Sequence, residues 1–171
     1  EAGKTAMHLH LFEDTLTDGQ TVSFGETAGR ASYVTAGEIT VNGTVHPRDE
    51  GFVTDGPVTL TAGAEGASLW RWDLSDVTPE DPPAHTSLKL SGEVPADLAA
   101  PGHFLRLDSV SFPVAGTAML HTHQGPGIRC LREGGIRIDA GGTSTSFGPG
   151  GSWFEIGPEP VFAQADHAVE S

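Results

Sequence analysis

Short stretches in which apolar and polar residues alternate recur along the chain. One lies at Met7-His8-Leu9-His10-Leu11, and another at residues 68–74 places both of its tryptophans on one face. Alternation of this kind is typical of a β-strand, because successive side chains point to opposite faces of a sheet. The same pattern predicts further short strands at residues 21–24, 31–34, 39–41, 52–53, 58–60, 104–107, 110–112, 117–123, 128–131, 136–138 and 153–155. We therefore predict an all-β protein.

Turn residues divide these stretches. Asn42-Gly43, between alternating segments, is the signature of a two-residue hairpin turn of type I′. Residues 75–87 hold three prolines and little apolar content, which is typical of a linker. The predicted organisation is a first β unit at 1–75, a linker at 76–88 and a second β unit at 89–171.

The two halves of the chain resemble each other. When the first half is aligned with the second by a shift of 97 residues, Gly37 matches Gly134 and Ile39 matches Ile136. After the hairpin the shift becomes 102 residues, and Phe52 matches Phe154. A period near 100 residues indicates two β-sandwich or barrel units. The first unit closes with residues 67–74, whose equivalent would begin after the last residue. We expect residues beyond it, another chain (hence a homodimer) or the segment 1–13 to complete the second unit.

Composition and charge narrow the classes of function. Gly and Pro make up 35 of 171 residues (23 + 12), which suits a turn-rich β protein, and the formal net charge is −14. Such a chain is repelled by nucleic acid and by anionic membrane surfaces, and no stretch is apolar for long enough to span a membrane. Cys130 is the single cysteine, so no internal disulfide can form. We expect a soluble protein, either cytoplasmic or exported after removal of a signal peptide before Glu1.

Two histidines stand at the end of one predicted strand, in Leu120-His121-Thr122-His123, ahead of a Gly-Pro-Gly turn. Side chains at i and i+2 share one face of a strand, and imidazole is the commonest protein ligand for transition metals. The equivalent positions of the first unit hold Phe24 and Glu26, so the pair belongs to the second unit alone. His8 and His10 have the same spacing, but no turn and cluster of further ligands follows, and we interpret them as the polar face of an edge strand.

A strand ending in His-x-His, followed by a short turn and by Gly134, resembles the first sequence motif of the cupins, and the repeat makes the chain similar to a bicupin. The resemblance implies two tandem double-stranded β-helix (jelly-roll) barrels and a metal with four ligands. In that family a glutamate would stand at Gly127, and a third histidine would end the segment Pro149-Gly150-Gly151-Ser152-Trp153-Phe154, at Phe154. Two of the four ligands of the family are therefore replaced.

Neighbouring residues are candidates to complete the site. A one-residue β-bulge would turn Glu155 inward as a third ligand or base. Arg129 lies two residues after position 127 and therefore on the same face of the strand, toward the cavity. As a permanent cation it would bind an anionic substrate. Gln124 and water are further ways to complete the coordination, and Cys130 is interpreted as a buried core residue. We expect Met119, Trp153 and Phe154 to form the apolar walls of the site. We expect His85, His103 and His167 to lie in solvated loops.

The resemblance implies a divalent metal (Fe, Mn, Ni or Zn) on His121, His123 and Glu155, with a small organic acid or phenolic as the substrate of an oxygenase-like enzyme. Glu155 and Arg129 are the catalytic candidates. The alternative is a non-catalytic small-molecule-binding or sensor protein, because two of the ligands of the family are missing. A purely structural protein is the third interpretation.

Overall fold

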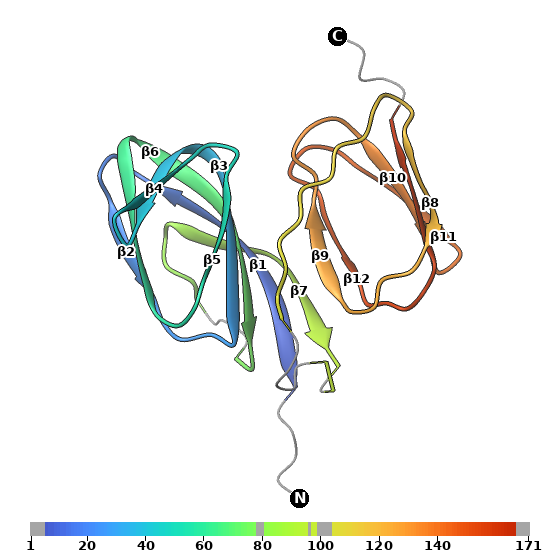
Figure 1. The fold of residues 1–171 in the computed structure, drawn as a ribbon, viewed down its shortest axis with the longest axis horizontal. Coiled ribbons are helices and arrows are strands. Elements are labelled where there is room, and N and C mark those ends of the chain that lie inside the picture. Colours follow the sequence, from blue (N-terminus) through green and yellow to red (C-terminus); the bar gives the residue numbers. More distant parts are fainter. Residues whose placement is uncertain (1–5, 78–80, 96, 99–103, 167–171) are drawn as a thin grey trace, which may run out of the picture. The chain divides into compact units, whose positions relative to one another are not determined.

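The structure is a computed structural model that describes residues 6–77, 81–95, 97–98 and 104–166. In this part of the chain every regular element is a β-strand, which confirms the all-β prediction, and no helix long and apolar enough to cross a membrane occurs there. The strands are β1 (Met7–Leu16), β2 (Thr21–Phe24), β3 (Gly29–Val41), β4 (Thr44–Pro47), β5 (Gly51–Thr54), β6 (Val58–Ser75), β7 (Thr86–Val94), β8 (Thr117–His121), β9 (Gly127–Cys130), β10 (Ile136–Ala140), β11 (Thr143–Phe147), β12 (Ser152–Glu155) and β13 (Val161–Ala165) (Figure 1).

The chain divides into two compact units, Glu1–Leu107 and Asp108–Ser171. This boundary differs from the predicted one. Strand β7 follows the proline-rich segment, yet it pairs antiparallel with β1 from Met7↔Val94 to Asp14↔Thr86. The segment after residue 75 is therefore a connection inside the first unit. Residues 78–80 of the predicted linker lie outside the described part of the chain.

The first unit is built on one seven-stranded sheet with the order β4-β3-β6-β1-β7, with β2 paired to β6 and β5 to β3. The long strands β3 and β6 pair from Gly29↔Leu74 to Val41↔Leu60, with two register shifts near Gly37. Gly37 has φ +68°, and a Cβ there would collide with the carbonyl oxygen of Gly66. Only glycine suits this close approach. The hairpin between β3 and β4 turns at Asn42 (φ 50°) and Gly43 (φ 80°), as predicted.

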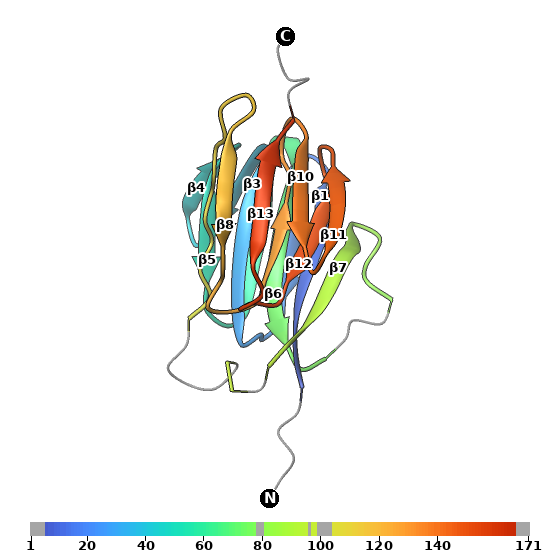
Figure 2. The ribbon, with the colours of Figure 1, turned by 90° about the vertical axis from the view of Figure 1, so that its right-hand side faces the viewer.

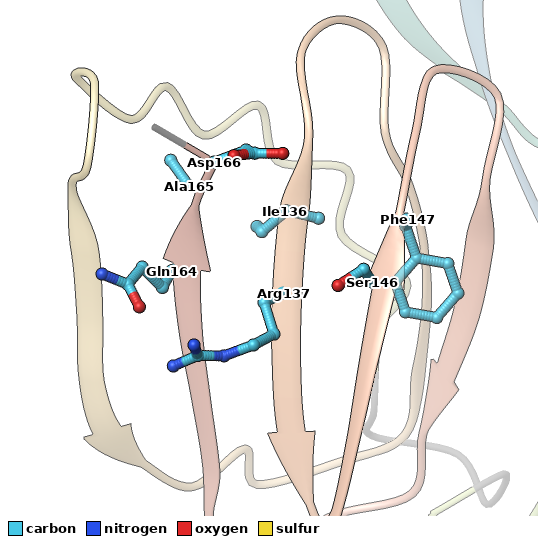
Figure 3. A pocket seen from close by; sticks show the side chains of 7 residues that line it. All are labelled: Ile136, Arg137, Ser146, Phe147, Gln164, Ala165 and Asp166. Carbon is cyan, nitrogen blue, oxygen red and sulfur yellow. The ribbon is translucent and has the colours of Figure 1, made fainter. Parts of the chain in front are cut away.

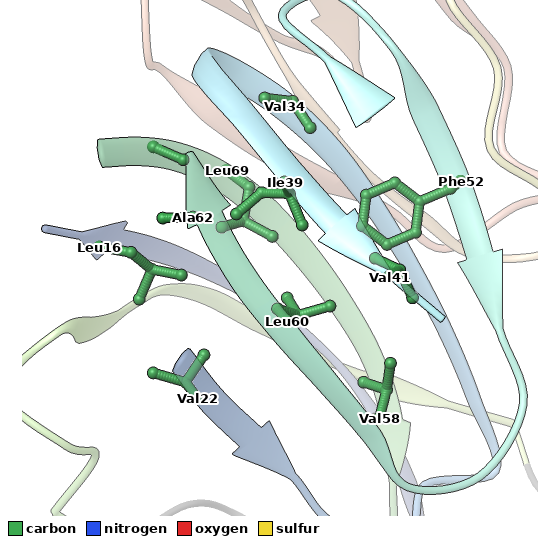
Figure 4. Close-up of a cluster of buried hydrophobic side chains, with 11 residues drawn as sticks. Leu16, Val22, Val34, Ile39, Val41, Phe52, Val58, Leu60, Ala62 and Leu69 are labelled. Atoms are coloured by element: carbon green, nitrogen blue, oxygen red, sulfur yellow. The ribbon is translucent and has the colours of Figure 1, made fainter. Parts of the chain in front are cut away.

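The apolar core of the first unit lies between its strands (Figure 4). Val34, Ile39 and Leu69 are fully buried, and a buried aliphatic side chain of this size stabilises a fold by about 1.5–3 kcal/mol. The cluster consists of Leu16, Val22, Val34, Ile39, Val41, Phe52, Val58, Leu60, Ala62, Ala67 and Leu69.

Beside this core the first unit buries a network of charged side chains. Arg71 pairs bidentately with Asp14 (Nε–Oδ2 2.7 Å, Nη2–Oδ1 3.2 Å) and also contacts the Asp73 carboxylate. Arg30 pairs bidentately with Asp73 (2.7 and 3.1 Å) and shares its Oδ2 atom with Arg71, and the Thr86 hydroxyl donates to Asp14 Oδ1 (2.6 Å). All five residues are buried. Because each buried charge has a partner and further hydrogen bonds, the network offsets much of its own desolvation cost.

The prediction that His8 and His10 lie on an edge strand is wrong. Strand β1 runs between β6 and β7, and His10 is fully buried. His10 lies on the same face of β1 as Asp14, opposite Asp73 of β6, so this face belongs to the polar interior. The two imidazoles stack on each other at 5.8 Å between ring centroids, and His10 Nε2–H donates to the Val77 carbonyl oxygen (3.1 Å).

The second unit has a four-stranded sheet, β11-β10-β13-β8, and a two-stranded sheet, β12-β9 (Figure 2). Its core is a small cluster of four buried side chains, Ile136, Ile138, Val161 and Ala163. The predicted strands at 104–107 and 110–112 are absent, because alternation forms a strand only where a neighbouring edge supplies hydrogen bonds. The segment 7–13 pairs inside the first unit, so it does not complete the second.

The strand pairings of the second unit repeat those of the first. Strand β8 pairs with β13 as β2 pairs with β6, and β9 pairs with β12 as β3 pairs with β5. The register makes Glu155, opposite Gly127, the equivalent of Thr54, opposite Arg30. The shift on these strands is therefore 101 residues (155 − 54), one less than predicted from sequence.

Candidate metal-binding site in the second unit

His121 and His123 lie together at the end of β8, where the chain turns toward β9. Their rings are 4.8 Å apart at an interplanar angle of 83°, and the two Nε2 atoms are 3.2 Å apart. The i, i+2 spacing thus brings both imidazoles to one side of the chain, as predicted. Neither ring is fully buried, and the His123 side chain is 33% exposed.

The backbone fixes the orientation of the first imidazole. His121 Nδ1 lies 2.7 Å from the carbonyl oxygen of Met119, so Nδ1–H donates to that oxygen. The Nε2 atom then carries the lone pair and faces His123. An imidazole held by one nitrogen to a carbonyl, with the other nitrogen unprotonated, is the usual state of a metal-ligating histidine.

Glu155 approaches this pair from β12. Its Oε2 atom lies 2.9 Å from His123 Nε2, and its Oε1 atom accepts a hydrogen bond from Trp153 Nε1–H (2.7 Å). The predicted β-bulge is absent, since β12 and β9 pair in an unbroken register from Ser152↔Cys130 to Glu155↔Gly127. Glu155 faces the histidines by ordinary alternation, and Phe154 occupies the opposite face.

Arg129 occupies the space next to Glu155. Its Nη2 atom lies 2.9 Å from Glu155 Oε2, and its Nη1–H donates to the Gly127 carbonyl oxygen (2.7 Å). A Cβ at residue 127 would come within 2.5 Å of Nη1 and 3.2 Å of Cζ. The guanidinium therefore takes part of the volume that a side chain at residue 127 would need, which is the position of the missing family glutamate.

Burial and charge change the protonation of the site. Burial lowers the pKa of His123 from its ordinary value, and the nearby Arg129 charge lowers it further, while Glu155 opposes the shift. The pKa of Arg129 is also lowered by burial, again opposed by Glu155. His123 is therefore mostly neutral at pH 7, and a neutral imidazole can become a metal ligand once its Nε2 gives up the hydrogen that faces His121 and Glu155.

The other sequence-predicted residues lie away from this point or on its margin. Gln124 is exposed, and Met119 is 79% exposed, so it forms no wall. Trp153 stacks on Phe147 at 4.8 Å, and Cys130 is half-buried, with Sγ 3.7 Å from the Gly150 carbonyl oxygen. His85, half-buried, makes an edge contact with Phe24 in the first unit. His103 and His167 lie outside the described residues.

Sequence reasoning missed two partners of the site. The Met119 carbonyl that orients His121 leaves no signal in the sequence, because any residue could supply a backbone oxygen. The contact with the Trp153 indole could have been predicted. Residues 153 and 155 lie on the same face of one strand, and Glu155 was already a candidate ligand.

The types of donor in this cluster suit a divalent metal. Metal bonds of about 2.0–2.2 Å place neighbouring ligand atoms roughly 3 Å apart, and His123 Nε2 has both other donors near that distance. Glu155 Oε2 is buried and makes no hydrogen bond, although His123 Nε2 and Arg129 Nη2 both lie 2.9 Å from it. Two histidines and one carboxylate form a three-ligand set that leaves coordination positions open. As the side chains stand, no group of three or more His, Cys, Asp or Glu in the described residues could hold a metal ion.

Comparison with known proteins shows the fold. No protein-family model matches the chain, and no curated protein matches it in sequence. The chain is similar in structure to a cupin 2 conserved barrel domain protein from Leptotrichia buccalis, with 12% identity, a TM-score of 0.52, and coverage of 94% of this chain and 78% of the other.

A second similar structure is a mutant salicylate 1,2-dioxygenase from Pseudoaminobacter salicylatoxidans, with 12% identity, a TM-score of 0.59, and coverage of 95% of this chain and 69% of the other. A further structure of the salicylate 1,2-dioxygenase gives 13% identity, a TM-score of 0.51, and coverage of 95% and 69%. At such identities the likeness establishes the fold, and the chain has a cupin-type β-barrel fold.

Proposed function

We propose that the chain is a tandem pair of cupin barrels whose second unit binds a divalent metal (Fe, Mn, Ni or Zn) through His121, His123 and Glu155. The protein then acts on a small organic acid or phenolic, in an oxygenase-like reaction. One observation carries the proposal: His123 Nε2 lies 3.2 Å from His121 Nε2 and 2.9 Å from Glu155 Oε2. Two imidazoles and a carboxylate that approach one another this closely have a metal ion as their natural common partner.

Each residue has a role in this proposal. His121, oriented by the Met119 carbonyl, and His123, kept neutral by burial, supply two lone pairs. Glu155 supplies one carboxylate oxygen while Trp153 holds the other. A bound metal would supply Lewis-acid or redox activation of the substrate. Because Gly127 and Phe154 supply no ligand, a bound metal would have room for a substrate.

The first unit has a structural role in this proposal. Phe24 stands at the position of His121, and its ring lies under the guanidinium of Arg71 (4.0 Å from Cζ to the ring centroid). The interior beside it is filled by the buried network of Arg30, Arg71, Asp14 and Asp73. Side chains that already have partners offer a metal no free ligands.

A second candidate function is non-catalytic binding of a small molecule. It is favoured by the contact between Arg129 and Glu155, which satisfies the carboxylate charge without a metal. In this case the second unit recognises a carboxylate or a hydroxylated compound through Arg129 and the two imidazoles, and the protein acts as a sensor or carrier.

Metal analysis of protein purified without an affinity tag tests the first function. Stoichiometric metal that is lost in His121→Ala supports it. A metal-free protein that takes up no Mn²⁺, Ni²⁺ or Zn²⁺ on dialysis, and whose thermal stability is unchanged by His123→Ala, would contradict it. A carboxylate that binds without metal would favour the second function.

A further inference from the structure

The carboxylate oxygen that a metal would use is already in contact with a cation of the protein itself. Glu155 Oε2 is 2.9 Å from His123 Nε2 and also 2.9 Å from Arg129 Nη2. The Glu155 side chain is 11% exposed, so its charge is screened only weakly by solvent. A metal that binds Oε2 therefore competes with the guanidinium for this oxygen.

We infer that Arg129 is the counter-ion of Glu155 in the metal-free site, that a divalent metal displaces it, and that the released guanidinium binds the carboxylate of an anionic substrate. This inference rests on the proposed metal site. It adds the class of substrate, a carboxylate, and a reason for metal and substrate to bind cooperatively.

The balance of charge supports this exchange. With neutral histidines, Glu155 and Arg129 cancel, and the metal-free site has no net charge. A divalent metal raises the site to a net charge of +2 and stands close to a guanidinium of the same sign. The guanidinium is then repelled from Glu155, and an anion that contacts both cations relieves the repulsion.

The space around residue 127 supports it as well. Gly127 leaves room for the guanidinium, because a Cβ there would come within 2.5 Å of Nη1. The Gly127 carbonyl also accepts a hydrogen bond from Nη1–H at 2.7 Å. That bond involves a different nitrogen from the one that faces Glu155, so the side chain can leave Glu155 and still lie beside the site. The planar guanidinium matches a carboxylate with two parallel hydrogen bonds.

Two substitutions remove the guanidinium from Glu155 by independent routes. Arg129→Gln removes the charge, and Gly127→Ala displaces the guanidinium by its added methyl group. Arg137 offers a matched control, because it pairs with Asp139 (Nε–Oδ1 3.3 Å) and lines a surface pocket with Ser146 and Gln164 (Figure 3). Arg137→Gln removes the same charge from the same unit but leaves Glu155 untouched.

The experiment is a calorimetric titration of metal-free protein with Ni²⁺, in the absence and in the presence of saturating benzoate, with benzamide as the uncharged comparison. In the wild-type protein and in Arg137→Gln, benzoate should tighten Ni²⁺ binding about tenfold and benzamide should not. In Arg129→Gln, Ni²⁺ alone should bind about tenfold more tightly, and benzoate should have no effect. Gly127→Ala should also bind Ni²⁺ more tightly without benzoate.

The outcomes separate this inference from the function on which it rests. If neither the wild-type protein nor either variant binds Ni²⁺, both the metal site and the inference are overturned. Equal Ni²⁺ affinity in wild type, Arg129→Gln and Gly127→Ala, with the same response to benzoate, would overturn the inference and leave the metal site standing. Weaker Ni²⁺ binding in Arg129→Gln would also overturn it, because Arg129 would then support the metal rather than compete with it.

Discussion

Glu155 faces His123 because β12 pairs with β9 in an unbroken register, in which Glu155 lies opposite Gly127. Two neighbouring strands thus supply an acid with no side chain opposite it, and the guanidinium of Arg129 fills the space left by the glycine. In the proposed metal site, Glu155 thus takes the part of the carboxylate that the cupin motif would place at residue 127, and it is carried on a different strand. The acid then reaches the histidines from β12, and we propose that metal binding depends on Glu155.

Replacing Glu155 should weaken metal binding. In Glu155→Gln the amide lacks the charge that a metal requires, and Arg129 loses its counter-ion. We expect Ni²⁺ affinity to fall at least tenfold, as judged by calorimetry, because one of three protein ligands is weakened. Glu159→Gln, an exposed change in the same unit, is the control. Unchanged affinity in Glu155→Gln would show that the carboxylate is not a ligand.

The indole of Trp153 should hold Glu155 for the metal. Trp153→Phe removes the Nε1–H that donates to Glu155 Oε1 and keeps the ring that stacks on Phe147. Loss of such an orienting partner typically lowers metal affinity about 10- to 100-fold. We expect a loss in this range with a small change in the free energy of unfolding, about 1 kcal/mol.

A matched control exists in the first unit. Trp70 Nε1–H donates to Glu13 Oε1 at 3.3 Å, the same type of bond at a place without paired imidazoles next to it. Trp70→Phe should lower stability by a similar amount and leave Ni²⁺ affinity unchanged. Equal losses of metal affinity in the two variants would mean that the effect of Trp153→Phe is one of general stability.

The sequence predicted the elements of this site better than their surroundings. The i, i+2 spacing was enough to bring His121 and His123 together, because this periodicity is a local property of the backbone. Glu155 was predicted to face inward, but through a bulge that does not exist. The error came from aligning Phe52 with Phe154, while the hydrogen-bonded register makes Trp153 the equivalent of Phe52. A shift by one residue moves every side chain of a strand to the other face.

The position of β1 could not be predicted from its own residues. His8 and His10 alternate with apolar residues, and a polar face normally lies toward solvent. In the structure that face lies against buried charges from β6, far away in the sequence, such as Asp73. The linker prediction failed for a related reason. Three prolines mark a break in local structure, but only the long-range pairing of β7 with β1 shows to which unit the following strand belongs.

The buried network predicts a large loss of stability in Asp14→Ala. This change leaves Arg71, which is 3% exposed, with Asp73 but without the Asp14 carboxylate as an ion-pair partner, and it removes the acceptor of the Thr86 hydroxyl. Breaking a buried ion pair by removing one partner typically costs about 3–5 kcal/mol. Urea denaturation followed by tryptophan fluorescence should show a loss of this size. Arg48→Ala, which breaks an exposed ion pair with Asp49, should change stability by about 0.5 kcal/mol or less.

The same interior predicts how stability depends on pH. Burial lowers the pKa of His10, helped by the neighbouring His8 and opposed by the Val77 carbonyl and Asp73. In the unfolded chain His10 binds a proton near its ordinary pKa of about 6.5, whereas in the folded protein it does so only at a lower pH. The free energy of unfolding therefore decreases as the pH falls from about 6.5 to the pKa of His10 in the folded protein. His10→Gln, whose amide can still donate to the Val77 carbonyl, should remove part of this loss. The measurement is the urea midpoint at about pH 7 and about pH 5, with His85→Gln as the control. A drop between the two pH values that is as large in His10→Gln as in the wild-type protein would show that another group titrates.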